Sequence, residues 1–396
     1  MSEVRVNNLT NENNTGGPTI SGITTYSGRH FFVPPQGDTA SRPEDCEPGS
    51  IRFNTDSAHL EYFRGNTIGW TEIEAELTAP LGGGTGSNAG LGVRGLIMGG
   101  QGSPDNTREE IEFITISTLG NSQDFGELTQ GSQAGFGGLG NRNHAFYAGG
   151  SQIPAGLNVI QKITVASTGN ATDYGDITSG NRASGGGASN QIRSILAGGN
   201  LGSPATNVIE YFSTIQSGNS VDFGDLSGAA EGVEGSVNSS TRGLIFGIAS
   251  YGANTIEFIT MSTTGNSSDF GDLTQGVASG AGGGNSTRGV VGGGYTPETS
   301  PATRVNTIQF VTIASTGNAQ DFGDLTQNRS GLNAMSSPTR TVFAGGAVYP
   351  TFYNVMDKIE IATTGNAIDF GDIAGSGSTN GAIFNSNAVS NGHGGL

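Results

Sequence analysis

Pairs of acidic residues three positions apart recur six times in this sequence, and carboxylate oxygens are the ligands that hard cations such as Ca²⁺ prefer. Each pair belongs to a motif in which Gly-Asn is followed shortly by Asp-aromatic-Gly-acid-aliphatic, first seen from Gly120 to Leu128. The motif lacks the dense Asp/Asn spacing of a calcium loop, and residues three apart on a strand point to opposite faces. We therefore expect no metal site and a structural role for the first acid of each motif, termed here the leading aspartate. The leading aspartates are Asp124, Asp173, Asp222, Asp269, Asp321 and Asp369.

A basic residue precedes an apolar strand once in each repeat, and it is a natural partner for the leading aspartate. Because successive strands alternate in direction, the turn with the basic residue and the turn before the aspartate lie on the same face. A guanidinium–carboxylate pair is charge-assisted and can be bidentate. We therefore predict a structural ring of Arg–Asp pairs, in which the basic partners are Arg94, His144, Arg193, Arg242, Arg288 and Arg340.

Other residues that could do chemistry do not form a catalytic set. Gly135–Gly140 matches a dinucleotide-binding fingerprint by letter, but no helix follows it and no βαβ unit surrounds it. The four histidines are scattered, and there is no nucleophile elbow, phosphate loop or cysteine pair. Cys46, the single cysteine, excludes an internal disulfide and fits a reducing cytoplasm. We expect no catalytic residue, no cofactor and no metal, and hence no enzyme.

The repeat itself predicts the fold. Successive leading aspartates are 47 to 52 residues apart in a Gly-rich chain, which is typical of a β-propeller with one blade per repeat. Each repeat reads as a Gly-rich strand, an apolar strand ending in Gly-Gly, a long strand and the motif strand. We predict an all-β fold with a six-bladed propeller of four-stranded blades. Asn380–Asn387 resembles a repeat-opening strand and is expected to close the ring beside Gly95–Gly100, which removes exposed edges.

The order of these strands resembles the kelch repeat of galactose-oxidase-like propellers, from residue 91 to residue 387. The resemblance implies a propeller that binds other molecules. The chain departs from the kelch pattern in its fourth repeat, where Gly247-Ile248 replaces Gly-Gly. It also has Phe or Tyr where kelch repeats usually have Trp, at Phe125, Tyr174, Phe223, Phe270, Phe322 and Phe370.

A small β-meander is predicted ahead of the repeats, with strands at Ile51–Asn54, Leu60–Phe63 and Trp70–Ile73. Residues 49–73 resemble a short module of tailed-phage virion proteins, especially tail fibres and baseplate-associated proteins; an unrelated three-stranded meander is the alternative. The expected domains are an extended anchor segment (1–43), the meander (44–78), a Gly-rich linker (79–90), the propeller (91–387) and a tail (388–396). Residues 79–90 also read as an extra strand.

Composition excludes some partners. The formal net charge is −17 and the chain has only two lysines, Lys162 and Lys358, which argues against binding to nucleic acid or an anionic membrane. Nowhere do 18 apolar residues run together, so we expect no membrane insertion and no standard secretory route.

Loops after the Gly-Gly strands differ between repeats and are the candidate binding regions, because binding residues concentrate on loops of a rigid scaffold. They span residues 101–109, 151–157, 200–206, 250–253, 295–305 and 347–354, all expected opposite the Arg–Asp face. The last two carry Tyr295, Tyr349, Phe352 and Tyr353, aromatic residues that suit a glycan or protein ligand. The alternative is that these loops only connect strands.

These expectations combine into a structural protein of a tailed-phage virion, assembled in the host cytoplasm and oligomeric within the particle. Residues 1–78 would bind other virion proteins, and the propeller would bind a host-surface glycan or protein. A cellular kelch-like propeller acting as a protein-interaction scaffold is the alternative. An enzyme with its active site on the loop face is the third hypothesis.

Overall fold

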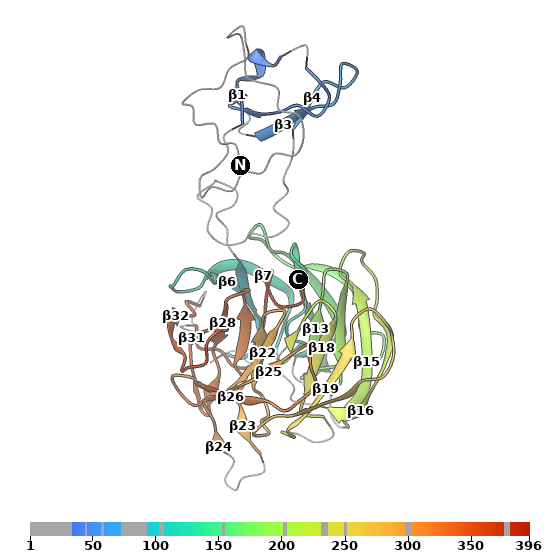
Figure 1. Cartoon of the computed structure of the whole chain (residues 1–396). Helices are drawn as coiled ribbons and strands as arrows, with labels where there is room; N and C mark the ends of the chain where they lie inside the picture. Colours follow the sequence, from blue (N-terminus) through green and yellow to red (C-terminus); the bar gives the residue numbers. More distant parts are fainter. Residues whose placement is uncertain are drawn as a thin grey trace, which may run out of the picture. The chain divides into compact units, whose positions relative to one another are not determined.

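The computed structural model describes residues 34–43, 46–56, 59–72, 93–102, 107–152, 155–200, 204–230, 237–248, 252–297, 303–375 and 381–396. These residues form an all-β structure with no α-helix; a single 3₁₀ turn, η1, spans Thr39–Ser41. The chain divides into two compact units, residues 1–76 and 77–396, each shown in Figure 1. The described residues contain no helix long and apolar enough to cross a membrane.

The first unit is a sheet with the order β1 (Gln36–Gly37), β2 (Ile51–Asn54), β3 (His59–Phe63) and β4 (Trp70–Glu72). The three predicted strands are present; residue 73, the expected end of the last one, lies outside the described residues. The short strand β1 was not expected, and it pairs parallel to β2 whereas the other pairs are antiparallel.

A polar cluster fills one face of this first sheet. Glu61 is fully buried and accepts from Arg42 Nη2 at 2.6 Å, with Arg52 Nε 3.3 Å away. Burial acts to raise the pKa of Glu61, but hydrogen bonds from Arg42 and Asn54 hold that pKa below its usual value. The opposite face presents apolar side chains, with Ile51 53% and Leu60 41% exposed.

The second unit repeats one sheet plan. Five sheets have four strands and one has three, and all pairs within them are antiparallel. In spatial order the sheets are β33 (Asn387–Ser390), β5 (Arg94–Met98), β6 (Arg108–Thr115), β7 (Gln123–Ser132); β8 (His144–Ala148), β11 (Val159–Thr164), β12 (Thr172–Asp176); β13 (Gly186–Ser189), β14 (Arg193–Ala197), β15 (Thr206–Ser213), β16 (Val221–Ala230); β17 (Val237–Asn238), β18 (Arg242–Phe246), β19 (Thr255–Thr260), β20 (Ser268–Asp272); β21 (Ala281–Gly284), β22 (Arg288–Gly292), β25 (Thr307–Thr312), β26 (Gln320–Asp324); and β27 (Asn333–Ser336), β28 (Arg340–Ala344), β31 (Val355–Glu360), β32 (Ile368–Asp372).

The three-stranded sheet keeps a remnant of the fourth strand. Phe136 forms an isolated bridge with Ala148, and Gly140 forms one with Ala145. Short hairpins leave three of the sheets: β9–β10 (Ser151–Gln152 and Ala155–Gly156), β23–β24 (Tyr295–Thr296 and Thr303–Arg304) and β29–β30 (Ala347–Val348 and Thr351–Phe352).

The apolar strands end before the Gly-Gly pairs, which are not part of them as the sequence led us to expect. Gly99 and Gly100 have φ of +60° and +101°, a left-handed conformation that Gly adopts without a steric penalty and that leaves the strand. Each strand also begins one residue earlier than predicted, at the basic residue itself.

The closing strand is real but was misplaced in the sequence. Strand β33 covers Asn387–Ser390 rather than Asn380–Asn387, so three residues assigned to the tail belong to the sheet. It pairs with β5 in the register Val389↔Leu96. Asn385, at φ +52°, interrupts the extended backbone just before the strand, whereas Phe384 bridges Gln101. Residue 380 lies outside the described part of the chain.

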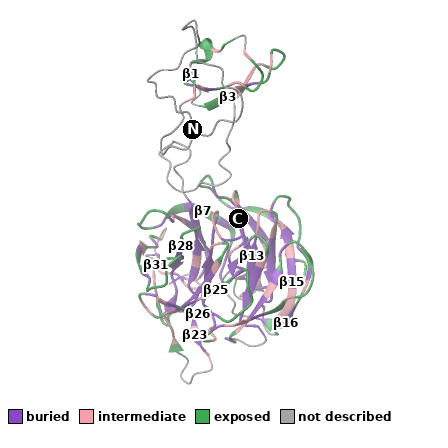
Figure 2. Cartoon of the chain, in the orientation of Figure 1, coloured by how far each residue is buried: buried purple, intermediate pink, exposed green. Residues whose placement is uncertain are grey.

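The core lies between neighbouring sheets (Figure 2). The motif aromatics are buried there; for example, Tyr174 contacts Phe146 of its own sheet and Phe212 of the next, with ring centroids 4.9 Å and 6.2 Å away. Inner strands of successive sheets also contact one another, and β33 contacts both β27 and β8. The first sheet therefore neighbours the last as well as the second.

Candidate functional site

The repeated motif joins neighbouring sheets, and we call each such junction a clasp. In the first, Gly169 N donates to Phe125 O at 2.7 Å, and Asn170 Oδ1 accepts from Glu127 N at 3.2 Å. The Asn bond recurs at every junction at 3.0 to 3.2 Å, as Asn170–Glu127, Asn219–Asp176, Asn266–Asp225, Asn318–Asp272, Asn366–Asp324 and Asn121–Asp372. The Gly-Asn of one repeat thus binds the motif strand of the repeat before it, and the first repeat binds the last.

The central Gly of the motif permits this close approach. Gly126 has φ +151°, and a Cβ there would lie 2.5 Å from Gly169 O in the next repeat. Such a contact is much shorter than van der Waals distance, so a side chain would push the two repeats apart.

The predicted Arg–Asp pairing is wrong. Arg242 Nη1 donates to Ile313 O at 3.1 Å and Ala314 O at 2.9 Å in the next sheet, and its guanidinium lies 4.7 Å from the Phe258 ring centroid. Arg94, Arg193, Arg288 and Arg340 make the same bond to a main-chain carbonyl of the following sheet. The leading aspartates are all exposed on the motif strand, so the guanidinium has closer acceptors than a solvated carboxylate.

Histidine replaces arginine in the second sheet, where the stacking partner is also different. The residue below the basic side chain is aromatic in four sheets, Phe113, Tyr211, Phe258 and Phe310, but is Lys162 in the second and Lys358 in the sixth. Burial and the charge of Lys162 lower the pKa of His144. A neutral ring at 144 therefore suits a site that faces a lysine.

A second series of polar residues, buried in the long strands, was missed in the sequence. It accepts hydrogen bonds from the Ser or Thr that follows the motif of the preceding repeat; Gln161 Oε1, for example, accepts from Thr129 N at 2.6 Å. The only signal was an acid or amide after the first apolar residue of each long strand. The series is Glu112, Gln161, Glu210, Glu257, Gln309 and Asp357.

Charge in this buried series is matched across the junction. Glu210 binds Arg182 at 2.8 Å, and Asp357 binds Arg329 at 2.9 Å, with all four side chains at most 4% exposed. Where the series has Gln161 instead, the segment of the preceding repeat carries no arginine, and the same holds for Gln309. Burial lowers the pKa of Arg182 although Glu210 opposes this, and burial raises the pKa of Glu112, whose partner is Ser122.

The predicted binding aromatics lie at the hairpins. Tyr349 is 76% exposed beside β29, and it presents most of its ring to solvent. Phe352 is partly buried and stacks on Phe384, with centroids 5.9 Å apart and planes 15° from parallel. Tyr295 lies under the guanidinium of Arg304 at 5.5 Å, and Tyr353 N donates to Gly346 O at 2.8 Å.

This arrangement suits binding rather than catalysis. The hairpins place aromatic faces beside one cation, Arg304, and the structure shows no nucleophile or proton-transfer pair near them. Within the described ranges, no three His, Cys, Asp or Glu side chains come together in a way that could hold a metal ion. The chemistry available is stacking on apolar ligand faces, with hydrogen bonds from the tyrosine hydroxyls.

Comparison with known proteins does not assign the chain. No family model matches it, and no curated protein does.

Proposed function

We propose that the repeated sheets form a six-bladed β-propeller that serves as the binding module of a tailed-phage virion protein. Closure is supported by contacts that join the first repeat to the last: the clasp between Asn121 and Asp372, the bridge between Phe384 and Gln101, and the bond from Arg340 to Ser117 O. Six repeats of one contact with no missing junction are what a closed ring requires.

The observation that carries the binding role is the contrast between the two ends of the sheets. The turns with the basic residues and the clasps repeat the same contacts, as expected of closure. The loops after the Gly-Gly pairs differ in sequence and hold the short hairpins with Tyr295, Tyr349 and Phe352. Variable loops on a rigid scaffold are a common site of recognition. A host-surface glycan or protein is the proposed ligand.

The first unit is proposed to attach the protein to the particle. Its support is the resemblance of residues 49–73 to a virion module and the exposed apolar face with Ile51 and Leu60, which a partner protein would cover. The protein would then be oligomeric within the virion. A cellular kelch-like scaffold, which would not need such an attachment face, is the alternative, and neither proposal is catalytic.

Separate variants test the two roles in the complete protein. Ile51→Ser with Leu60→Ser is expected to abolish incorporation into particles and to leave host-cell binding unchanged. Tyr349→Ala is expected to leave incorporation unchanged and to weaken cell binding at least fivefold. Particles are purified and probed with an antibody to the chain, and cell binding is measured with labelled protein.

Ile215→Ser serves as the control, because Ile215 is 74% exposed and lies in neither surface. It should affect neither readout. The proposal is contradicted if the protein is absent from purified particles, or if the Ile51/Leu60 variant is incorporated normally.

A further inference from the structure

Residues 391–396, called here the tail, continue inward from β33. Arg94 N donates to Asn391 Oδ1 at 2.9 Å, and Asn391 N donates to Arg94 O at 3.2 Å. Asn391 takes a place that belongs, in the other repeats, to a residue three positions before the basic one. Those residues are Asn141, Asn190, Ser239, Asn285 and Ser337. The tail therefore completes the first repeat.

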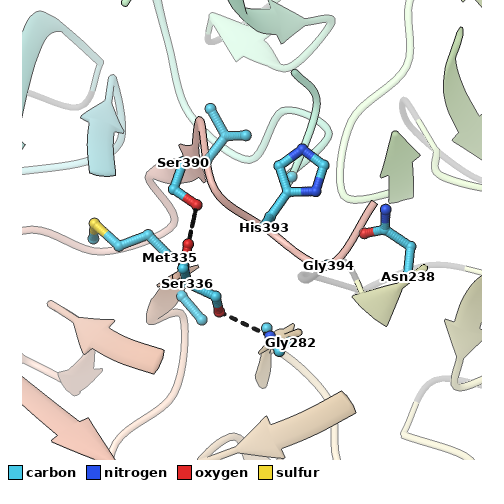
Figure 3. A pocket seen from close by; sticks show the side chains of 12 residues that line it. Asn238, Gly282, Met335, Ser336, Ser390, His393 and Gly394 are labelled. Carbon is cyan, nitrogen blue, oxygen red and sulfur yellow. Dashed lines mark hydrogen bonds between the residues drawn. The ribbon is translucent and has the colours of Figure 1, made fainter. Parts of the chain in front are cut away.

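Beyond Asn391 the tail passes between the inner strands of the sheets. Figure 3 shows His393 and Gly394 among residues of β17, β21, β27 and β33. A Cβ on Gly394 would overlap the carbonyl oxygen of Asn238, and one on Gly395 would overlap that of Ser189. Together with Arg94, Gly140 and Asn285, these contacts join the tail to the first five sheets.

The two hydrogen bonds of His393 specify its charge. The Nε2 atom lies 3.1 Å from Gly140 O, which can only accept, and Nδ1 accepts from Gly395 N at 3.2 Å. Only the neutral ring with its proton on Nε2 makes both bonds. A second proton on Nδ1 would point at the N–H of Gly395 and break the turn that holds the tail.

We propose that the tail is an acid-sensitive latch, which holds the inner ends of five sheets together while His393 is neutral and releases them when His393 is protonated. This inference concerns the described contacts and does not depend on the proposed virion role.

The surroundings of His393 offer no compensation for a positive charge. Two cavities, of about 20 Å³ and 140 Å³, adjoin the ring, and none of the residues that line them is acidic. Asn238, Met335, Ser336 and Ser390 face it from the strands, and Arg142 is the other charged side chain along the larger cavity. An imidazolium would be opposed by Arg142 and unpaired.

Burial lowers the pKa of His393 to about 4, and the hydrogen bond to Gly140 O opposes this only in part. In the unfolded chain a histidine titrates near its ordinary value of about 6.5. A lowered pKa in the folded state means that stabilisation is complete above that value and is lost as pH falls from about 6.5 towards 4.

The test uses the complete protein at pH 7.5 and pH 4.5. Hydrogen–deuterium exchange of the peptide covering residues 387–396 is measured and corrected for the intrinsic effect of pH. We expect protection of the tail amides to fall at least tenfold at pH 4.5 and to return at pH 7.5, while β14 and β22 stay protected. Imidazole NMR signals of the four histidines should place the His393 pKa more than one unit below 6.5.

Two variants complete the test. His393→Gln, which cannot be protonated, should show the same tail protection at both pH values. His144→Arg, which restores the residue of the other repeats at a second partly buried histidine, should keep the wild-type response. The proposal is overturned if wild-type tail protection does not change with pH, if all strands lose protection together, or if His393→Gln still responds to acid.

Discussion

At the scale of single residues, the amide and glycine of the motif make the contacts, and the acid that drew attention does not. Asn170 satisfies a main-chain N–H in the neighbouring repeat, while Asp173 four residues later has its side chain in water. The sequence displays both with equal regularity. Regular spacing therefore identified a structural repeat, but it could not tell which residue of the motif forms the junction.

The arginine series leads to a prediction at this scale. Arg242→Ala removes two hydrogen bonds to carbonyls of the next sheet and a ring contact with Phe258, and we expect a loss of about 1–3 kcal/mol in the free energy of unfolding. Asp269→Ala, which removes a leading aspartate of the same repeat, should change it by less than about 0.5 kcal/mol. Urea denaturation of both variants measures this. Equal losses would restore the Arg–Asp pairing that the structure argues against.

At the scale of the strand, the buried polar residue of each long strand sets the chemistry of one junction. A buried carboxylate without a partner is costly, whereas an amide is not charged and needs only hydrogen bonds. Glu210 and Asp357 accordingly face arginines, and Gln161 and Gln309 face hydroxyl and main-chain donors. The sequence showed these residues as members of polar–apolar alternation, and burial between sheets is what gives them partners from another repeat.

The junction between the second and third sheets tests this account. Arg182→Ala leaves Glu210 buried without its ion pair and is expected to cost about 3–5 kcal/mol. Adding Glu210→Gln should recover more than half of that loss, because the double variant resembles the junction that Gln161 makes. Thermal melting and urea denaturation of the single and double variants provide the comparison. If the second change makes the protein less stable still, charge matching does not explain these junctions.

At the scale of the whole molecule, the sequence supported an all-β chain of repeated sheets, the meander strands near Ile51 and Trp70, and a last strand in the first sheet. It placed that last strand too early, because Phe384 and Asn385 resemble strand residues while the positive φ of Asn385 depends on packing against neighbouring repeats. It gave no sign that His393 lies between the sheets. Contacts among residues more than two hundred positions apart, such as His393 with Gly140, cannot be read from local patterns.

Closure of the repeats by the last strand is the central claim, and a cysteine pair measures it most directly. Leu96 and Val389 are opposite in the β5–β33 register, and opposite residues of an antiparallel pair lie at a distance that a disulfide can span. In a Cys46→Ser background, Leu96→Cys with Val389→Cys should form an intramolecular disulfide under mild oxidation, detected by mass spectrometry and by a shift on non-reducing gels. Leu96→Cys with Ala388→Cys should not, since a slip of one residue turns the side chain to the other face. Failure of the first pair to crosslink, or equal crosslinking of both pairs, would contradict closure by β33.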